Sequence, residues 1–398
     1  MIAEPPPGGL FGVYVHIPFC SKRCDYCAFA TWTGKESLVD EYVTACVAEV
    51  GAARAGEATS VFFGGGTPSL IGADQLLRIL DVIPRVAGAE VTVECNPESV
   101  TAELLRRYRA GGVTRISLGV QSMVEGVLGS AGLGREHGPA EARRAIDLVA
   151  SGGFGSFNVD LIYGAACETD ADWQRTLEEV VALDPMPPHI SAYALTVEAG
   201  TPLAADKDRY PDDDVQARRY EVADDAFGRA GLEWYEISNW AVPGHECVHN
   251  MTYWFGADYR GYGCAAHSHE SGRRWWNIRT PERYIRAVSE QPGPTPALAS
   301  SEVLGPAERE FEALELSLRT RRGVPRAAVP ADPELDHLVD RSAGRAVLTR
   351  AGRMLANEVS VRLLVGVSGP DGGDTATGSG PDRVPNVLKL VEERAAHW

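Results

Sequence analysis

Three cysteines lie within eight residues near the start of the chain, in the segment CSKRCDYC that contains Cys20, Cys24 and Cys27. The alternating run Val13–Ile17 just before it predicts a β-strand that ends in a loop. A [4Fe–4S] cube has four irons and is normally held by four thiolates. Three clustered cysteines would therefore leave one iron open to a substrate or cofactor. A zinc site, which needs a fourth ligand nearby, and a disulfide with a spare thiol are the alternatives.

Strand-like and helix-like segments alternate six times after this point, which is typical of a parallel α/β sheet. Apolar residues between Leu38 and Val50 recur at helical spacing, and Cys46 falls on that apolar face as a core residue. Six units rather than eight predict an open, partial (β/α)6 barrel. The expected strands are Val13–Ile17, Ser60–Phe63, Glu90–Cys95, Arg115–Gly119, Phe157–Ile162 and Ile190–Leu195.

Polar or glycine-rich groups close nearly every expected strand, and such ends form the site face of α/β barrels. In FFGGGTPS, consecutive glycines would let a ligand approach the backbone amides closely, although such turns are often only turns. Glu94 and Asp160 stand at otherwise apolar strand ends, where a charge is costly without a partner. A ligand ammonium or ribose would supply that partner. A salt bridge or a helix N-cap is the alternative.

The cysteine spacing resembles that of radical S-adenosylmethionine (SAM) proteins. The motifs YVHIPFC, FFGGGTPS, ECNP, RISLGVQS, NVDLIYG and HNMTYW, in this order, resemble the branch related to oxygen-independent coproporphyrinogen III oxidase, and within it most closely the haem chaperone group HemW. The resemblance implies a [4Fe–4S] cluster on Cys20, Cys24 and Cys27, whose open iron holds SAM. It implies SAM contacts from Tyr14, Gly65, Gly66, Thr67, Glu94, Gln121, Arg135 and Asp160.

Two features favour the chaperone group over the decarboxylating oxidase. The oxidase has a further cysteine two positions after the third cluster cysteine, where this chain has Phe29. It also carries a long N-terminal arm, whereas only ten residues precede the first strand motif here. The resemblance thus implies a haem chaperone without coproporphyrinogen oxidase activity. Coproporphyrinogen III decarboxylation and radical SAM methyl transfer remain the enzymatic alternatives.

The HNMTYW motif lies in a stretch rich in tryptophan and histidine. Flat side chains can cover a porphyrin and a neutral imidazole can ligate its iron. His249 is the leading candidate for the axial haem ligand, with Tyr253 and Trp254 about one helical turn further on. Packing between the barrel and the C-terminal region is one alternative. A zinc site is the other, formed from Cys247, His249, Cys264 and His267.

Composition indicates a cytoplasmic protein. The five remaining cysteines are scattered singly rather than arranged as a disulfide framework. We expect neither a signal peptide nor a transmembrane segment. Lysine and arginine number 38 against 55 acidic residues, a net charge of −17, which argues against nucleic acid as a partner.

The chain divides into four expected parts. A radical SAM partial barrel spans 1–235, and an aromatic- and histidine-rich connecting segment with the HNxxYW motif spans 236–291. PGPTPALASSE then indicates a linker. A small, mainly helical domain with a short hairpin, winged-helix-like, spans 301–365, and a disordered linker with a short tail helix spans 366–398. The resemblance also implies haem-requiring clients, membrane-associated respiratory enzymes among them, and a homodimer.

Overall fold

The structure is a computed structural model that describes residues 9–291 and 293–365. The disordered linker and tail helix expected at 366–398 lie outside the described residues. No helix in the described part of the chain combines the length and the apolar character that a membrane crossing requires.

Two compact units make up the chain. Among the described residues, the larger unit contains 9–253 and 257–303, and the smaller one contains Trp254–Gly256 together with 304–365. The domain boundaries drawn from the sequence stay predictions.

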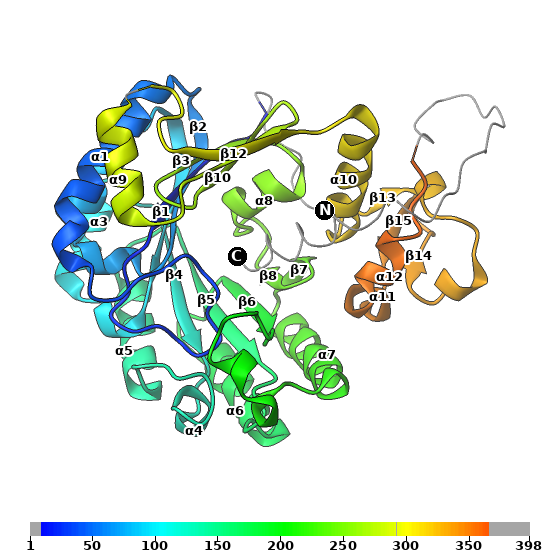
Figure 1. Cartoon of the computed structure of the whole chain (residues 1–398). Coiled ribbons are helices and arrows are strands. Elements are labelled where there is room, and N and C mark those ends of the chain that lie inside the picture. Colours follow the sequence, from blue (N-terminus) through cyan, green and yellow to red (C-terminus); the bar gives the residue numbers. More distant parts are fainter. Residues whose placement is uncertain (1–8, 292, 366–398) are drawn as a thin grey trace. The chain divides into compact units, whose positions relative to one another are not determined.

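Parallel strands form the centre of the larger unit, in the order β1-β2-β3-β4-β5-β6 (Figure 1). Each of the six strands expected from the sequence is present, so that prediction is confirmed. The strands are β1 (Phe11–Ile17), β2 (Ala58–Gly65), β3 (Arg85–Cys95), β4 (Arg115–Gln121), β5 (Ser156–Tyr163) and β6 (His189–Ala194).

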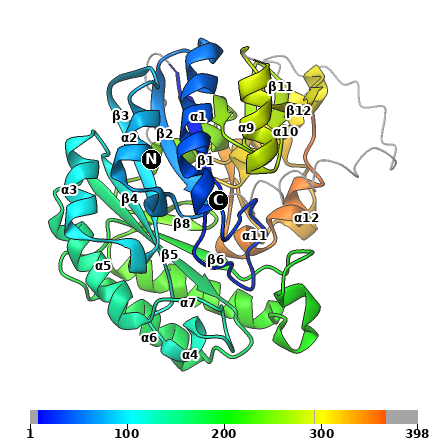
Figure 2. The same cartoon turned by 60° about the vertical axis from the view of Figure 1, so that its left-hand side comes forward.

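Helices connect these strands and line one side of them (Figure 2). Tyr42, Val43, Cys46 and Val50 are all buried on the first helix, which confirms its expected apolar face. Thr101 and Thr169 accept backbone N–H bonds at two of the helix starts, the usual way to satisfy the first free amides. The helices are α1 (Val39–Ala53), α2 (Ala73–Leu80), α3 (Ala102–Ala110), α4 (Glu125–Leu128), α5 (Pro139–Ser151), α6 (Asp170–Val181) and α7 (Asp213–Arg229).

Further strands extend the sheet at both edges, giving the order β12-β11-β10-β9-β1-β2-β3-β4-β5-β6-β8-β7. The sequence reading missed these additions, and it wrongly assigned all of PGPTPALASSE to a linker. Leu298 onward pairs antiparallel with Arg273–Asn277, because backbone pairing at a free edge needs little from the side chains. The added elements are β7 (Glu233–Glu236), β8 (Asn239–Ala241), α8 (Val248–Trp254), β9 (Asp258–Tyr262), β10 (His267–Glu270), β11 (Arg273–Asn277), α9 (Pro281–Glu290) and β12 (Leu298–Val303).

The smaller unit combines short helices with a three-stranded antiparallel sheet in the order β13-β15-β14. Leu314, Leu318, Ala346 and Leu348 are buried in its core. Its elements are α10 (Pro306–Leu318), β13 (Val324–Pro325), β14 (Val339–Asp340), β15 (Arg345–Leu348), α11 (Arg350–Met354) and α12 (Ala356–Ser360).

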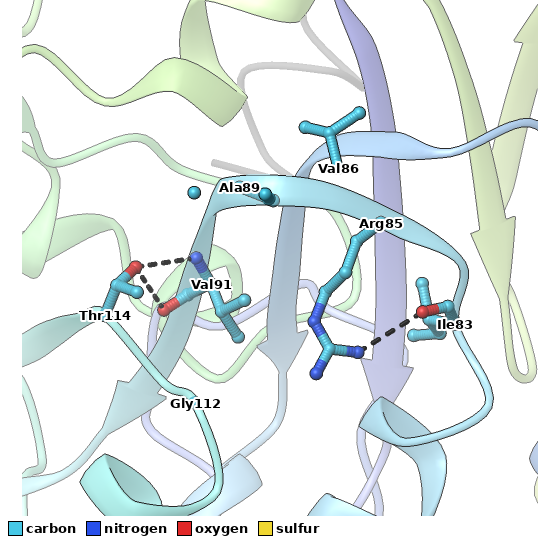
Figure 3. A pocket seen from close by; sticks show the side chains of 9 residues that line it. Ile83, Arg85, Val86, Ala89, Val91, Gly112 and Thr114 are labelled. Atoms are coloured by element: carbon cyan, nitrogen blue, oxygen red, sulfur yellow. Dashed lines mark hydrogen bonds between the residues drawn. The ribbon is translucent and has the colours of Figure 1, made fainter.

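A cavity of about 460 Å³ lies at the amino-terminal ends of β3 and β4 (Figure 3). Its lining includes Ile83, Val86 and Val91, with Arg85 and Thr114 as polar members. Arg85 donates to the Ile83 carbonyl and Thr114 to the Val91 carbonyl, so both side chains are used to fix the chain here. The cavity therefore lies at the end of the barrel opposite the cysteine loop.

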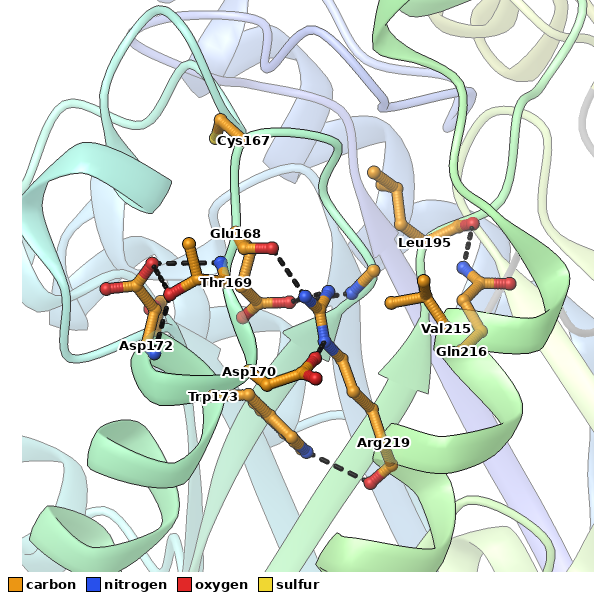
Figure 4. A network of polar contacts seen from close by, with 12 residues as sticks. Cys167, Glu168, Thr169, Asp170, Asp172, Trp173, Leu195, Val215, Gln216 and Arg219 are labelled. Atoms are coloured by element: carbon orange, nitrogen blue, oxygen red, sulfur yellow. Dashed lines mark hydrogen bonds and ion pairs between the residues drawn. The ribbon is translucent and has the colours of Figure 1, made fainter.

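A buried ion pair fastens α7 to the loop before α6 (Figure 4). Arg219 Nη1 lies 2.7 Å from Glu168 Oε2, with side-chain exposures of 5% and 0%. The Trp173 indole donates to the Arg219 carbonyl at 3.0 Å. Burial raises the pKa of Glu168 to about 7, against the opposing effects of the Gly164 amide and Arg219.

We expect Arg219→Leu to lower the free energy of unfolding by about 3–5 kcal/mol, because it leaves the Glu168 carboxyl buried without its cation. Urea unfolding followed by circular dichroism measures this. Arg143→Ala is the control, since Arg143 pairs with Glu179 at the surface, and exposed pairs contribute about 0–1 kcal/mol. Equal losses in the two variants would refute the structural role of the buried pair.

Candidate functional site

The cysteine loop begins directly after β1 and is tied down at both ends. The Cys20 backbone N–H donates to the Trp32 carbonyl oxygen at 3.1 Å, and the Trp32 backbone N–H donates to the Pro18 carbonyl oxygen at 2.7 Å. Asp25, midway along the loop, pairs with Arg209 at 2.9 Å. The loop is thus held in place by its own backbone and by the segment after β6.

A chain of hydrogen bonds joins two of the loop thiols through neighbouring strand ends. Thr67 donates to Cys20 Sγ at 3.9 Å, and the Asn96 amide donates to Thr67 at 2.9 Å. Arg135 donates to Asn96 Oδ1 at 2.7 Å and to Cys24 Sγ at 3.1 Å. The expected convergence of the strand ends is therefore seen at these residues. Sequence reasoning assigned no role to Asn96, although it named ECNP as a strand-ending group.

The donor set fits an iron–sulfur cluster. The three thiols lie within electrostatic reach of one another, and burial raises the pKa of Cys20 to about 11. Iron that binds the Cys20 sulfur must displace the thiol proton. N–H and O–H donors that point at the sulfurs then help to set the reduction potential of the cluster. Within residues 9–291 and 293–365, no three His, Cys, Asp or Glu side chains converge as one metal ion requires. In a [4Fe–4S] cube each thiolate binds its own iron, which suits three thiols spaced along a loop.

The glycine turn at the end of β2 packs directly against the start of the cysteine loop. A Cβ on Gly66 would lie 2.6 Å from the Phe19 carbonyl oxygen, and one on Gly65 would lie 2.4 Å from the His16 ring. The Gly66 amide donates to Ile17 at 2.7 Å and the Thr67 amide to Phe19 at 2.8 Å. These N–H groups are used within the protein, and the SAM contacts expected from Gly65, Gly66 and Thr67 stay predictions. The absent side chains let β1 and its loop approach this turn.

Two carboxylates, Glu94 of β3 and Asp160 of β5, lie within electrostatic reach of each other. Glu94 accepts from the Gly65 amide at 3.2 Å, and Asp160 accepts from Ser117 at 2.9 Å and Asn158 at 2.7 Å. None of these contacts is an ion pair or a helix N-cap, the alternatives considered from the sequence. Burial, followed by the charge of Asp160, raises the pKa of Glu94 to about 8. A cationic or hydroxyl-bearing ligand would find two acceptors here.

This raised pKa predicts a pH dependence of stability. Between pH 4.5 and about 8 the folded protein keeps the Glu94 proton that the unfolded chain has lost, so stability falls as pH rises. We expect Glu94→Gln to recover about 1–2 kcal/mol of the loss between pH 5.5 and 7.5, a partial effect because the side chain is half-buried. Urea unfolding of the SAM-free protein at both pH values measures it. An identical pH slope in the variant would contradict the prediction.

Gln121 and Arg135 carry polar atoms that the described residues leave unsatisfied. Gln121 ends β4 with a φ of 62°, a left-handed backbone rare for this residue, and its Oε1 is buried without a hydrogen-bond partner. Arg135 Nε is buried without one as well. Buried polar atoms are normally paired. Both residues were candidates for SAM contacts, and their free atoms favour a ligand at this position.

Tyr14 reaches the cysteine loop through His16, a residue to which sequence reasoning assigned no role. The Tyr14 hydroxyl lies 3.0 Å from His16 Nδ1, and His16 Nε2 lies 2.8 Å from the Ala30 carbonyl oxygen. His16 is 5% exposed. The polar histidine within the apolar motif YVHIPFC, four residues before the first cysteine, was the signal in the sequence. Its ring holds the far end of the loop against the strand.

The HNMTYW segment lies in α8, which places Tyr253 one helical turn beyond His249. His249 is fully buried, and both of its ring nitrogens have partners: Ser60 Oγ at 3.0 Å and the Tyr253 hydroxyl at 3.0 Å. Burial lowers the pKa of His249 to about 3. Trp254 is the last residue of α8 and is half-buried. His249 thus packs against the barrel strands, and its role as an axial haem ligand stays a prediction.

The other members of the suggested zinc site lie in separate surroundings. Cys247 Sγ contacts Glu90 at 3.4 Å, and Cys264 Sγ accepts from Tyr42 at 3.6 Å. His267 stacks on Trp276. The zinc interpretation is therefore wrong for the described residues.

A parallel sheet whose first strand leads into a three-cysteine loop is the arrangement of radical SAM proteins. The family model described as "Radical SAM superfamily" matches residues 14–180. The heme chaperone HemW of Mycobacterium tuberculosis is 41% identical over 386 residues, covering 91% of this chain and 96% of that protein. The heme chaperone HemW of Escherichia coli is 38% identical over 276 residues, covering 67% and 71%. The chain belongs to the HemW family of radical SAM proteins.

A solved structure confirms the fold. Coproporphyrinogen III oxidase (HemN) from Escherichia coli, a radical SAM enzyme, superposes with a TM-score of 0.74 over 88% of this chain and 89% of that one. The two sequences are 22% identical. This likeness shows the shared α/β architecture.

Proposed function

We propose that this protein is a haem chaperone, which binds haem and passes it to haem-requiring client proteins. The observation that carries the proposal is the 41% identity to a heme chaperone over 96% of that relative's length. Phe29, at the position where the oxidase has a further cysteine, supports the same reading against porphyrinogen decarboxylation.

We propose that Cys20, Cys24 and Cys27 hold a [4Fe–4S] cluster. When bound, the cluster supplies an open iron that can chelate SAM and an electron that can cleave it. Arg135 and Thr67 direct donors at two cluster sulfurs. Gln121, Glu94 and Asp160 present acceptors for the bound SAM. In a chaperone the cluster and SAM regulate haem transfer or dimerisation rather than drive turnover.

The proposed clients are haem enzymes, including membrane-associated respiratory ones, and the proposed location is the cytoplasm. The net charge of −17 supports a protein client rather than nucleic acid. A homodimer is part of the proposal.

Haem titration tests the proposal. We expect anaerobically reconstituted protein to bind one haem per chain with a dissociation constant of about 1 μM or tighter, near −8 kcal/mol, read from the shift of the Soret band. Haemin in buffer without protein is the control. A Soret band that never departs from the control would refute the proposed function.

A further inference from the structure

A chain of side-chain hydrogen bonds crosses the larger unit from α8 to β5. Its members are Asn250 of α8, Tyr235 of β7, His189 of β6, and Asn158 and Asp160 of β5. The three middle side chains are buried, with exposures of 0% to 4%, whereas the two end residues are half-buried. The chain therefore joins two partly exposed positions through the interior of the unit.

All hydrogen bonds of this chain point toward Asp160. A carboxylate only accepts, so Asn158 directs its amide nitrogen at Asp160 Oδ1, at 2.7 Å. The Asn158 amide oxygen then faces His189 Nδ1 at 2.6 Å, which places the ring proton on Nδ1. His189 Nε2 is left to accept from the Tyr235 hydroxyl at 2.8 Å, and Tyr235 accepts from the Asn250 amide at 3.3 Å. Hydrogen bonds aligned in this way polarise and strengthen one another.

His189 is the nearest donor to the Asn158 amide oxygen. Ser191 Oγ lies 3.2 Å from the same oxygen but only 2.7 Å from Asn239 Oδ1. Burial, followed by the charge of Arg115, lowers the pKa of His189 well below its usual value, so the ring is neutral and holds a single N–H. This N–H determines which way the Asn158 amide faces.

Asn158 in turn orients both oxygens of the Asp160 carboxylate. One amide N–H donates to Asp160 Oδ1, and the other donates to Ser117 Oγ at 2.7 Å. Ser117 donates to Asp160 Oδ2 at 2.9 Å. Burial raises the pKa of Asp160, whereas the bonds from Ser117 and Asn158 lower it, so these bonds favour the charged carboxylate. A charged carboxylate held in one orientation is a strong acceptor for an ammonium or a ribose hydroxyl.

We propose that His189 is a positioning residue for SAM, because through Asn158 it holds Asp160 as an acceptor for the bound SAM. Tyr235 and Asn250 hold the His189 ring in the orientation that this requires. The proposal rests on the SAM site proposed above and adds residues that do not touch SAM themselves. It also connects Asn250, within HNMTYW, to the SAM site, although the sequence analysis linked this motif to haem.

Two amide side chains of different length test the proposal in the full-length, cluster-reconstituted protein. An Asn amide nitrogen can take the place of His189 Nδ1, so His189→Asn should bind SAM as the wild type does. A Gln amide reaches the place of Nε2 instead, so His189→Gln, like His189→Leu, should weaken SAM binding about tenfold. Calorimetric titration measures the affinity. Iron content and circular dichroism should stay those of the wild type in all three variants.

Tyr235→Phe removes one hydroxyl from the chain and nothing else. We expect it to weaken SAM binding about threefold, because the His189 ring loses its second partner. Tyr220→Phe is the matched control, since it also removes a buried tyrosine hydroxyl, which donates to the Ile237 carbonyl at 3.0 Å and not to this chain. The control should bind SAM as the wild type does.

The outcomes distinguish the positioning role from the SAM site itself. Equal SAM affinities in His189→Asn and His189→Leu would overturn the positioning role. If His189→Leu does not fold, Tyr235→Phe decides, and an affinity equal to that of Tyr220→Phe would overturn it. Asp160→Asn should lose most of its SAM affinity. Wild-type SAM binding in Asp160→Asn would instead overturn the SAM contact proposed for Asp160, and the role of His189 with it.

Discussion

Cys24→Ala should abolish the broad iron–sulfur absorbance of anaerobically reconstituted protein. Each loop thiolate holds one iron, and a cube on two protein thiolates loses one of the three bonds that keep it on the chain. Cys24 also accepts from Arg135 at 3.1 Å, so the substitution removes the anchor of a buried guanidinium at the same time. Iron and sulfide analysis beside the visible spectrum measures the loss.

Cys167→Ala is the control for this prediction. Cys167 is exposed and contacts the Gly126 carbonyl at 3.8 Å, away from the cysteine loop. We expect its iron content to match the wild type. A full four-iron complement in Cys24→Ala would rule out the three-cysteine assignment.

Gly66→Val should disrupt both the cluster and SAM binding. The first atom of the new side chain would lie 2.6 Å from the Phe19 oxygen and 2.8 Å from the Ile17 oxygen, both backbone atoms that cannot rotate away. The start of the cysteine loop must therefore move, and Cys20 with it. This differs from the expectation that a ligand alone approaches the glycines, under which the cluster would survive. Iron content and calorimetric SAM titration, run on the same sample, measure the two losses.

Gly56→Val is the matched control, because nothing lies within 4 Å of a Cβ added at Gly56. Circular dichroism checks the folding of both variants. A Gly66→Val protein with wild-type iron content that still loses SAM would show that the glycine serves the ligand rather than the loop.

The parallel strands could be predicted from the sequence because each is a short apolar run closed by a turn. Val13–Ile17 became β1 and Phe157–Ile162 became β5 with only small changes at the ends. The cysteine loop could be predicted as well, since local spacing defines it. The exposed edge strand Leu298–Val303 could not, because its residues are mostly exposed and its pairing comes from the sheet beside it.

Residue roles that depend on contacts between distant segments could not be predicted from the sequence. The partners of His249 come from Ser60 and Glu90, more than a hundred positions earlier in the chain. Asn96 links the two thiol-binding side chains because its side-chain amide donates to Thr67 and accepts from Arg135, which come from other parts of the chain. A motif shows that such residues matter, but the packing decides whether they bind a ligand or hold a helix.

The most direct test of the account compares haem transfer with porphyrinogen decarboxylation in one preparation. Reduced, reconstituted wild-type protein would be loaded with haem and mixed with a haem-depleted client, and a second aliquot would receive SAM and coproporphyrinogen III without oxygen. We expect haem to move to the client and no protoporphyrinogen to form. Decarboxylation at enzymatic rates, with no transfer of haem, would contradict the proposed chaperone function.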